Sequence, residues 1–351
     1  MITVGEAKQI AKDWVEAQAP NIPNFQGAFL NGSILWKNDD EPQPVTSDVD
    51  VKILVDLDDP KLLSEQDLIQ QYRSYKGVIL DTTFSLFQEF STPEQILANY
   101  HYGANFTFPN ILSDPSGVLS KIQKVVASKY EQRKWVTKRV GGARDYVLSG
   151  LDSLKSGSYV DRLLSLFVTS LHIALIPILA DLRPPTIRKS GIVFLQIMKN
   201  IGRLDLHESL LNFYGSQSFD RADVERHLED LTNTFDRSLE IVQSPSLSDY
   251  INPLARSLVI SASQEMINQG FHCEAMFWIF CMRAVCQDTI LRDAPDEEQM
   301  YYSKKFEELL AELGLHSEDD FQKRAEDGRR LLEEVMQVAL EIVDKNPKII
   351  H

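Results

Sequence analysis

The stretch FLNGSILWKNDDEPQPVTSDVDVKILVDL, residues 29–57, decides the fold of the N-terminal part of the chain. It holds a Gly-Ser turn, a polar loop with two prolines, and then an alternating run, Asp48-Val49-Asp50-Val51, that is typical of a β-strand. Successive side chains of a strand point to opposite faces, so Asp48 and Asp50 share one face and the valines pack on the other. Two neighbouring carboxylates repel each other unless they are solvated, as acids on an exposed strand face most often are, or neutralised by a cation, so a divalent metal is a candidate partner of the pair.

The sequence around this stretch mixes helical and strand-like periods. We expect a helix to begin directly after the Gly-Ser turn. In residues 1–117 the pattern predicts helices over 4–18 and 62–76 and strands over 27–31, 48–56 and 78–87.

From about residue 118 the helical period dominates the chain. It predicts helices over 119–155, 159–180, 190–201, 221–242, 250–269, 271–291, 298–313 and 318–344. The predicted fold class is therefore α+β, with a mixed α/β domain over 1–117 and an all-helical domain over 118–351 that forms the other wall of a cleft.

Composition restricts the class of protein. A chain of 351 residues with 43% hydrophobic content can bury two cores, and its formal net charge of −15 argues against nucleic acid as a partner. The sequence shows no signal-peptide core and no uninterrupted apolar run of the ~20 residues that cross a bilayer. We expect a cytoplasmic protein that does not enter the membrane.

The three cysteines lie in one apolar helical stretch, GFHCEAMFWIFCMRAVC. An odd number of cysteines without metal-ligand spacing favours free, buried thiols over disulfides or a zinc site. The stretch itself, residues 270–286, is typical of a helix in a protein core.

A third acid, Asp81, falls on the strand expected after the Asp-x-Asp strand. The elements stand in the order Gly32-Ser33, Ser47-Asp48-Val49-Asp50-Val51 and Asp81. This order resembles the nucleotidyltransferase superfamily and, within it, the bacterial aminoglycoside adenylyltransferases of the streptomycin/spectinomycin type. The motif resemblance covers roughly residues 25–90, and the helical region is similar only in kind.

The resemblance implies a nucleotidyltransferase with Mg²⁺ as cofactor, two ions in all, and ATP as nucleotide donor. It implies that Asp48 and Asp50 bind the metal and that Asp81 is a third ligand or the base that takes the acceptor's proton. The acceptor would be the hydroxyl of a small, cationic, aminoglycoside-like molecule. Acidic residues in the first domain suit such an acceptor, because carboxylates attract polyamines.

The nucleotide is expected at the Gly-Ser turn. Gly32 would let the backbone approach the triphosphate, and the Ser33 hydroxyl and N–H at a helix start would bind phosphate oxygens. Ser47, directly before the Asp-x-Asp pair, belongs to the same expected nucleotide site.

Three features depart from the pattern. The spacer between Ser33 and Asp48 has 14 residues and is longer than expected, and no small residue followed by Arg comes after the Gly-Ser. Asp81 stands where some relatives have Glu, which bears on the base role more than on the metal role.

Two basic clusters are candidates for closing over the triphosphate. For such charges a solvated helix face is the ordinary interpretation. Lys138 and Arg139 are assigned to the nucleotide site, although the two clusters cannot be ranked from the sequence. The first cluster holds Lys134, Lys138, Arg139 and Arg144, and the second holds Arg183, Arg188 and Lys189.

A different class of function stays open beside the enzyme. The chain could be a non-catalytic nucleotide-binding regulatory or antitoxin-like protein that keeps the fold and uses the acids only for binding. The presence of all three acids favours the enzyme. The sequence leaves the acceptor, the preferred nucleotide and the oligomeric state open.

Overall fold

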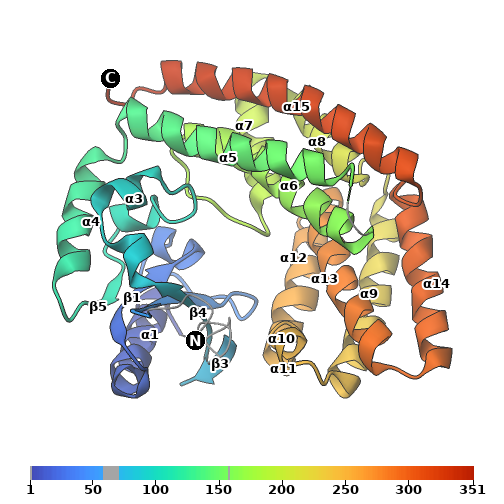
Figure 1. Cartoon of the computed structure of the whole chain (residues 1–351), viewed down its shortest axis with the longest axis horizontal. Helices are drawn as coiled ribbons and strands as arrows, with labels where there is room; N and C mark the ends of the chain where they lie inside the picture. The colour runs from blue at the N-terminus through green and yellow to red at the C-terminus, as the bar shows by residue number, and fades with distance from the viewer. Residues whose placement is uncertain (1, 58–70, 157–158) are drawn as a thin grey trace. The chain divides into compact units, whose positions relative to one another are not determined.

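The structure, a computed structural model, describes residues 2–57, 71–156 and 159–351 (Figure 1). The chain forms two compact units, one of residues 1–139 with 348–351 and one of residues 140–347. The first is built on a mixed sheet and the second is helical, so the predicted α+β class is confirmed. The division between the units falls inside helix α5 (Arg133–Ser153), later in the chain than residue 117.

A five-stranded sheet organises the first unit. Its strand order is β3-β4-β2-β1-β5, in which β2 and β4 run parallel and the other neighbours run antiparallel. The strands are β1 (Phe25–Asn31), β2 (Val49–Val55), β3 (Gln71–Tyr75), β4 (Val78–Leu86) and β5 (Ile111–Ser113).

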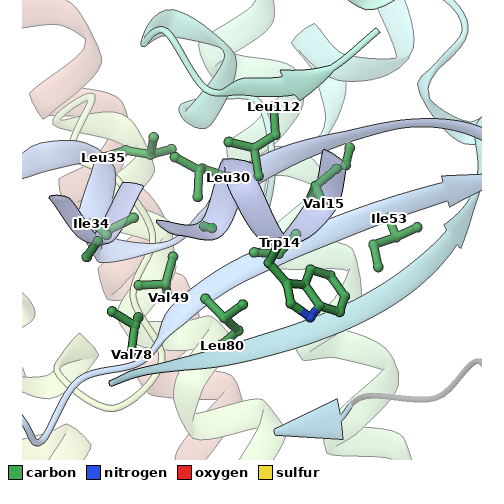
Figure 2. Packing of buried hydrophobic residues seen from close by; sticks show 14 of the residues in the cluster. Trp14, Val15, Leu30, Ile34, Leu35, Val49, Ile53, Val78, Leu80 and Leu112 are labelled. Carbon is green, nitrogen blue, oxygen red and sulfur yellow. The ribbon is translucent and has the colours of Figure 1, made fainter. Parts of the chain in front are cut away.

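Helix α1 (Val4–Gln18) covers one face of this sheet. The Thr3 side chain accepts a hydrogen bond from the Glu6 N–H and the Glu6 carboxylate accepts one from the Thr3 N–H, a capping box that fixes where the helix begins. Trp14 and Val15 pack with the buried residues of β2 and β4 (Figure 2). On β2 these residues are Val49, Val51, Ile53 and Val55. Their alternation leaves the acids of the strand for the opposite face.

The predicted helix over 62–76 is wrong where it can be compared. Residues 71–75 form β3, which pairs antiparallel with β4, and residues 62–70 lie outside the described residues. Lys76 and Gly77 have positive φ angles of 48° and 81°, as the two central residues of a tight hairpin turn require. The hairpin therefore overrides the local helical period.

The first unit also contains short helices around its last strand, β5. Helix α3 (Pro93–Ala98) and a 3₁₀ turn (Asn105–Thr107) precede β5, and α4 (Val118–Lys129) follows it. The single helix predicted over 119–155 is divided into α4 and α5. At the break Gln132 bridges to Ile350, so the C-terminal residues belong to this unit.

Arg139 joins the ends of α3 and α4. Its side chain is fully buried, its Nη1 and Nη2 donate to the Leu97 and Tyr130 carbonyls at 2.9 Å each, and its guanidinium lies 3.8 Å from the centre of the Tyr130 ring. Burial lowers the pKa of Arg139. Arg139 therefore has a structural role, because its Nη1 and Nη2 bind carbonyls inside the unit, and its predicted contact with a triphosphate stays a prediction.

Replacing Arg139 by Met should cost stability, because two buried carbonyls lose their donor. The loss is partly offset by removal of a desolvated charge, so we expect roughly 2–3 kcal/mol in urea unfolding. The exposed neighbour Lys138 supplies the control Lys138→Met, which should change stability little. ATP affinity of the folded Arg139→Met variant, measured by calorimetry, tests the predicted triphosphate contact: an affinity equal to that of the wild type would exclude Arg139 from the nucleotide site, and a large loss would support it.

The second unit is made of helices, and α5 contributes its residues 140–153 to it. Helix α8 was not predicted, and the segment predicted as one helix over 250–269 is interrupted by a π-helical turn over Ser257–Ser261. The helices are α6 (Tyr159–Ala180), α7 (Ser190–Ile201), α8 (Leu204–Tyr214), α9 (Arg221–Ile241), α10 (Pro245–Ser248), α11 (Pro253–Arg256), α12 (Ala262–Asn268), α13 (His272–Asp293), α14 (Asp296–Glu312) and α15 (Glu318–Lys345).

Helix α6 bears on the expectation that the protein does not enter the membrane. Its stretch Asp161–Ala180 is long and apolar enough to cross a bilayer, but 78% of that window is buried inside the protein. Such burial is typical of the core helix of a soluble protein. The predicted core helix α13 contributes Met276, Phe280 and Cys286 to the same interior, and all three cysteines are free.

Candidate metal centre

Strands β2 and β4 bring three aspartates together. Because the two strands are adjacent and in parallel register, Asp50 lies directly opposite Asp81. Asp48 precedes β2 and is separated from Asp50 by one residue, which places both on one face. Carboxylate oxygens of Asp48, Asp50 and Asp81 all lie within 4.8 Å of one another. The structure therefore assembles the three acids that the sequence singled out.

Burial distinguishes this group from ordinary surface acids. Asp81 is only 6% exposed, and Asp48 and Asp50 are half-buried. Asp81 is therefore not an ordinary solvent-exposed acid of the strand. Three carboxylates at this separation repel one another strongly in a partly desolvated site, and a hard divalent cation with oxygen ligands relieves the repulsion. The group can hold a metal ion.

The turn before the first acid is fixed by Gln43. Its Nε2 donates to the carbonyl oxygens of Ser47 at 3.1 Å and Asp48 at 3.4 Å. The Ser47 N–H donates to the Pro44 carbonyl at 3.1 Å, which closes a turn. The polar, proline-containing loop therefore holds the backbone from which the Asp48 side chain projects.

Gly32 contacts the acid group directly. Its φ of +73° lies in the left-handed region, and a Cβ added there would overlap Asp50 Oδ2. A side chain at this position would therefore displace the Asp50 carboxylate. This contact explains why glycine is needed at residue 32 without reference to a triphosphate, and the predicted approach of a triphosphate stays a prediction.

Replacing Gly32 by Ala should displace the Asp50 carboxylate. The backbone at Gly32, with φ +73° and ψ −163°, is in a region essentially restricted to glycine, so roughly 1–3 kcal/mol of strain accompanies the substitution. A Cβ at Gly117, where φ is +71° and ψ is 10°, meets no atom within 4 Å, so Gly117→Ala is a control for a side chain at positive φ away from the acids. We expect thermal stability to fall in both variants, more in Gly32→Ala, but loss of Mn²⁺ binding, measured by the EPR signal of the free ion, only in Gly32→Ala. Equal Mn²⁺ binding in the two would contradict the displacement of Asp50.

The helix expected after the Gly-Ser turn is a single 3₁₀ turn, Ser33–Trp36. Ile34 and Leu35 are buried in the sheet core, and the Leu35 N–H donates to the Gly32 carbonyl at 3.3 Å. The expectation of a full helix start at Ser33 is therefore wrong, because the turn serves to anchor two apolar side chains. A phosphate contact of Ser33 stays a prediction on this shorter element.

Sequence reasoning missed three further residues on the acid face. Asn31 lies opposite Asp50 and Tyr72 lies opposite Asp81, so a polar row crosses four strands. Asn105, which is 1% exposed, donates from Nδ2 to Asn31 Oδ1 and fixes its amide. After Asn31 and Tyr72, the third residue on the acid face is Lys52, two positions after Asp50. Its period-2 spacing from the acids was the available signal, whereas Asn31 and Tyr72 required the register.

Apart from Arg139, the basic residues of the first predicted cluster contact neighbours within their own helix. The Lys134 and Lys138 ammonium groups lie 5.1 Å and 5.7 Å from the centre of the Trp135 ring, and Arg144 pairs with Asp145 at 2.6 Å.

In the second cluster, Arg183 pairs with Asp181 at 2.6 Å and Arg188 donates to the Leu258 carbonyl at 3.0 Å. Lys189 is the N-cap residue of α7. Contact of either cluster with a triphosphate stays a prediction.

The first unit thus combines a five-stranded mixed sheet, a preceding helix and a partly buried group of three aspartates, an arrangement consistent with a nucleotidyltransferase-like fold. Comparison of the sequence with protein-family models and with curated proteins gives no match.

Proposed function

We propose that this protein is a metal-dependent nucleotidyltransferase that moves a nucleoside monophosphate, AMP from ATP, to a hydroxyl group of a small acceptor. The observation that carries the proposal is the meeting of Asp48, Asp50 and Asp81 on adjacent parallel strands, with ligand atoms within 4.8 Å. The order of these acids after the Gly-Ser turn supports it through the resemblance to the superfamily.

The residues present fit Mg²⁺, which prefers carboxylate oxygens. Asp48 and Asp50 would hold the metal, and Asp81 would complete the set from β4. Gly32 supports the fit, because it lacks a Cβ where the Asp50 carboxylate lies. When bound, Mg²⁺ neutralises the charge that develops on the attacking and leaving oxygens; two ions would serve the two ends of the transfer.

The reaction forms one bond and breaks one bond. The acceptor oxygen attacks the α-phosphorus of ATP in line with the bridging oxygen, and the bond to that oxygen breaks and releases pyrophosphate. Asp81 takes the hydroxyl proton on its carboxylate and passes it to solvent. Asp48 and Asp50 keep their charge throughout and orient the triphosphate end of the site.

The class of acceptor is proposed from the charge of the protein and from the resemblance to the superfamily. The formal net charge of −15 favours a neutral or cationic small molecule over nucleic acid, and the resemblance suggests an aminoglycoside-like compound. Lys138 and Arg139 of the basic helix α5 stay candidates for the triphosphate. We propose a cytoplasmic location, because MgATP is available there.

The test is a pyrophosphate-release screen with purified protein. MgATP, MgGTP, MgCTP and MgUTP would each be offered with hydroxylated antibiotics and cellular metabolites. We expect release that depends on both an acceptor and a divalent cation. Tight MgATP binding without pyrophosphate release, across all acceptors, would instead favour a non-catalytic nucleotide-binding regulatory or antitoxin-like protein.

A further inference from the structure

The helical second unit contains a hollow that no step of the proposed reaction uses. It has a volume of about 880 Å³ and is bordered by α6, α13, α14 and the chain at α10. Small-molecule sites in proteins have volumes of roughly 300–1,000 Å³. The residues that line the hollow lie between 159 and 316, all in the second unit, so the acid group of the first unit is no part of it. The hollow is therefore a separate candidate site of small-molecule size.

The walls of the hollow are mainly apolar. Helix α13 lines it with Ala284, Val285 and Leu291, and α14 lines it with the buried Phe306 and Leu310. Residues at these spacings share one side of a helix, which in a folded protein normally packs against a neighbouring element. Here the two helix faces border a space instead, and an apolar molecule would complete their packing.

Exposed apolar side chains gather at the rim of the hollow. They are Tyr159, Leu164, Tyr250 and Leu291, each between 41% and 48% exposed. Apolar surface that is gathered in this way marks a binding site, whereas single exposed apolar residues are ordinary. The Tyr159 ring is fixed, because its hydroxyl donates to the Leu315 carbonyl at 2.6 Å. Burial and the nearby Glu307 charge raise the pKa of Tyr159 to about 12, which keeps this donor protonated.

Gln287 supplies a polar group in the wall. Its side chain is 6% exposed, and its Nε2 donates to Ser303 Oγ at 2.9 Å, from α13 to α14. Among the residues that the structure describes, no donor is found for its Oε1. A buried carboxamide oxygen without a donor costs free energy, so a donor group on a bound molecule would be favourable there.

The charge at the rim is negative. Asp288 pairs with Arg292 at 2.9 Å, so these two charges balance, and His316 lies 3.5 Å from Asp320. Glu307 also lines the hollow, and it has no ion-pair partner within residues 2–57, 71–156 and 159–351. An unpaired carboxylate beside apolar walls favours a ligand with a positive charge over one with a negative charge.

We propose that this hollow binds a small amphipathic amine, with its apolar body between α6, α13 and α14 and its ammonium group beside Glu307. A hydrogen-bond donor on the apolar body pairs with Gln287 Oε1. The site adds a second ligand to the protein, beyond the proposed transfer reaction, and it needs neither metal nor nucleotide.

The experiment titrates the full-length protein, without metal or nucleotide, with dansylcadaverine and follows the rise in probe fluorescence. This probe combines an aromatic ring system, a sulfonamide N–H and a terminal ammonium group. The matched probes are the dansyl amide of pentylamine, which is neutral, and the dansyl amide of aminohexanoic acid, which is an anion. We expect saturable binding, with the anion roughly tenfold weaker than the cation at low salt.

Two exposed residues of the rim allow the site to be tested without disturbing the fold. Leu291→Ser should weaken binding of all three probes by roughly fivefold, because apolar contact is lost. Leu204→Ser is its control, since Leu204 is 45% exposed and does not line the hollow. Glu307→Gln should weaken binding of the cation by roughly threefold and strengthen that of the anion. Its control is Glu308→Gln, because the neighbouring Glu308 pairs with Lys305 at 3.6 Å and lies outside the hollow.

The proposal is rejected if no probe gives a saturable change, or if Leu291→Ser and Leu204→Ser bind the probes alike. Equal binding of the cation and the anion by the wild type would reject the amine as the ligand class. A second copy of the chain is the competing occupant: a wild-type dimer that Leu291→Ser makes monomeric, measured by sedimentation, would make the hollow an interface instead. Asp50→Asn should bind the probes like the wild type, so failure of the proposed metal site would leave this inference standing.

Discussion

Asp50→Asn is expected to reduce nucleotidyl transfer to the background rate while leaving the fold intact. Asp50 is the central member of the acid group, opposite Asp81 on β4 and one residue removed from Asp48. An amide offers a metal one neutral oxygen in place of a charged carboxylate, so the substitution removes the strongest kind of Mg²⁺ ligand at the centre of the site. Pyrophosphate release with a responsive acceptor measures the loss.

The thermal stability of Asp50→Asn should not fall with its turnover. Without metal, Asp50→Asn relieves repulsion within the group, so its melting temperature should equal or exceed that of the wild type. Mg²⁺ should then stabilise the wild type but not the variant, because only the wild type binds it in the native state. Asp56→Asn is the matched control, since Asp56 is exposed just beyond the end of β2. Unchanged turnover in Asp50→Asn would remove the basis of the proposed function.

The acid group could be predicted because it depends on short-range alternation. The run from Asp48 to Ile53 alternates so regularly that β2 and its two faces follow from the sequence, and the observed strand is Val49–Val55. Asp81 could be added because 78–87 has the same strand character, observed as Val78–Leu86. Parallel pairing of β2 with β4 then brings the acids together.

The rest of the face could not be predicted because it depends on which strands become neighbours. Asn31 and Tyr72 join the acid row only through the antiparallel registers of β1 with β2 and β3 with β4. The strand β3 was itself missed, because a helical period was extended through a hairpin whose turn is set by the backbone at Lys76 and Gly77.

Arg139, in a helix, is a further residue whose contacts could not be predicted from the sequence. Its position in a basic, amphipathic segment indicates a solvated or ligand-binding side chain. Its observed acceptors include the Leu97 carbonyl, 42 residues earlier in the chain, and the Tyr130 carbonyl at the break between two helices. Local pattern carries no information on such a distant partner, so the burial of a single arginine in a basic helix was not foreseeable.

Asp81→Ala should separate the chemistry from the binding of nucleotide. Asp81 lies on β4, whereas Asp50 lies on β2 and Asp48 directly before it, so removal of Asp81 leaves a pair of metal ligands in place. If Asp81 takes the proton of the acceptor hydroxyl, turnover should fall by at least roughly 100-fold, as for the loss of a general base, while MgATP affinity changes little. Single-turnover pyrophosphate release and calorimetric titration with MgATP measure the two quantities.

The control for this variant is Ser85→Ala, on the same strand and opposite Leu54, away from the acid row. It should leave both turnover and MgATP affinity unchanged. Because Asp81 is 6% exposed, a loss of folding in Asp81→Ala is checked by circular dichroism and bypassed with Asp81→Asn, which keeps the side-chain volume. Equal losses of turnover and of MgATP affinity in the folded variant would make Asp81 a metal ligand without a base role. Unchanged turnover would exclude it from the reaction and leave Asp48 and Asp50 as the functional pair.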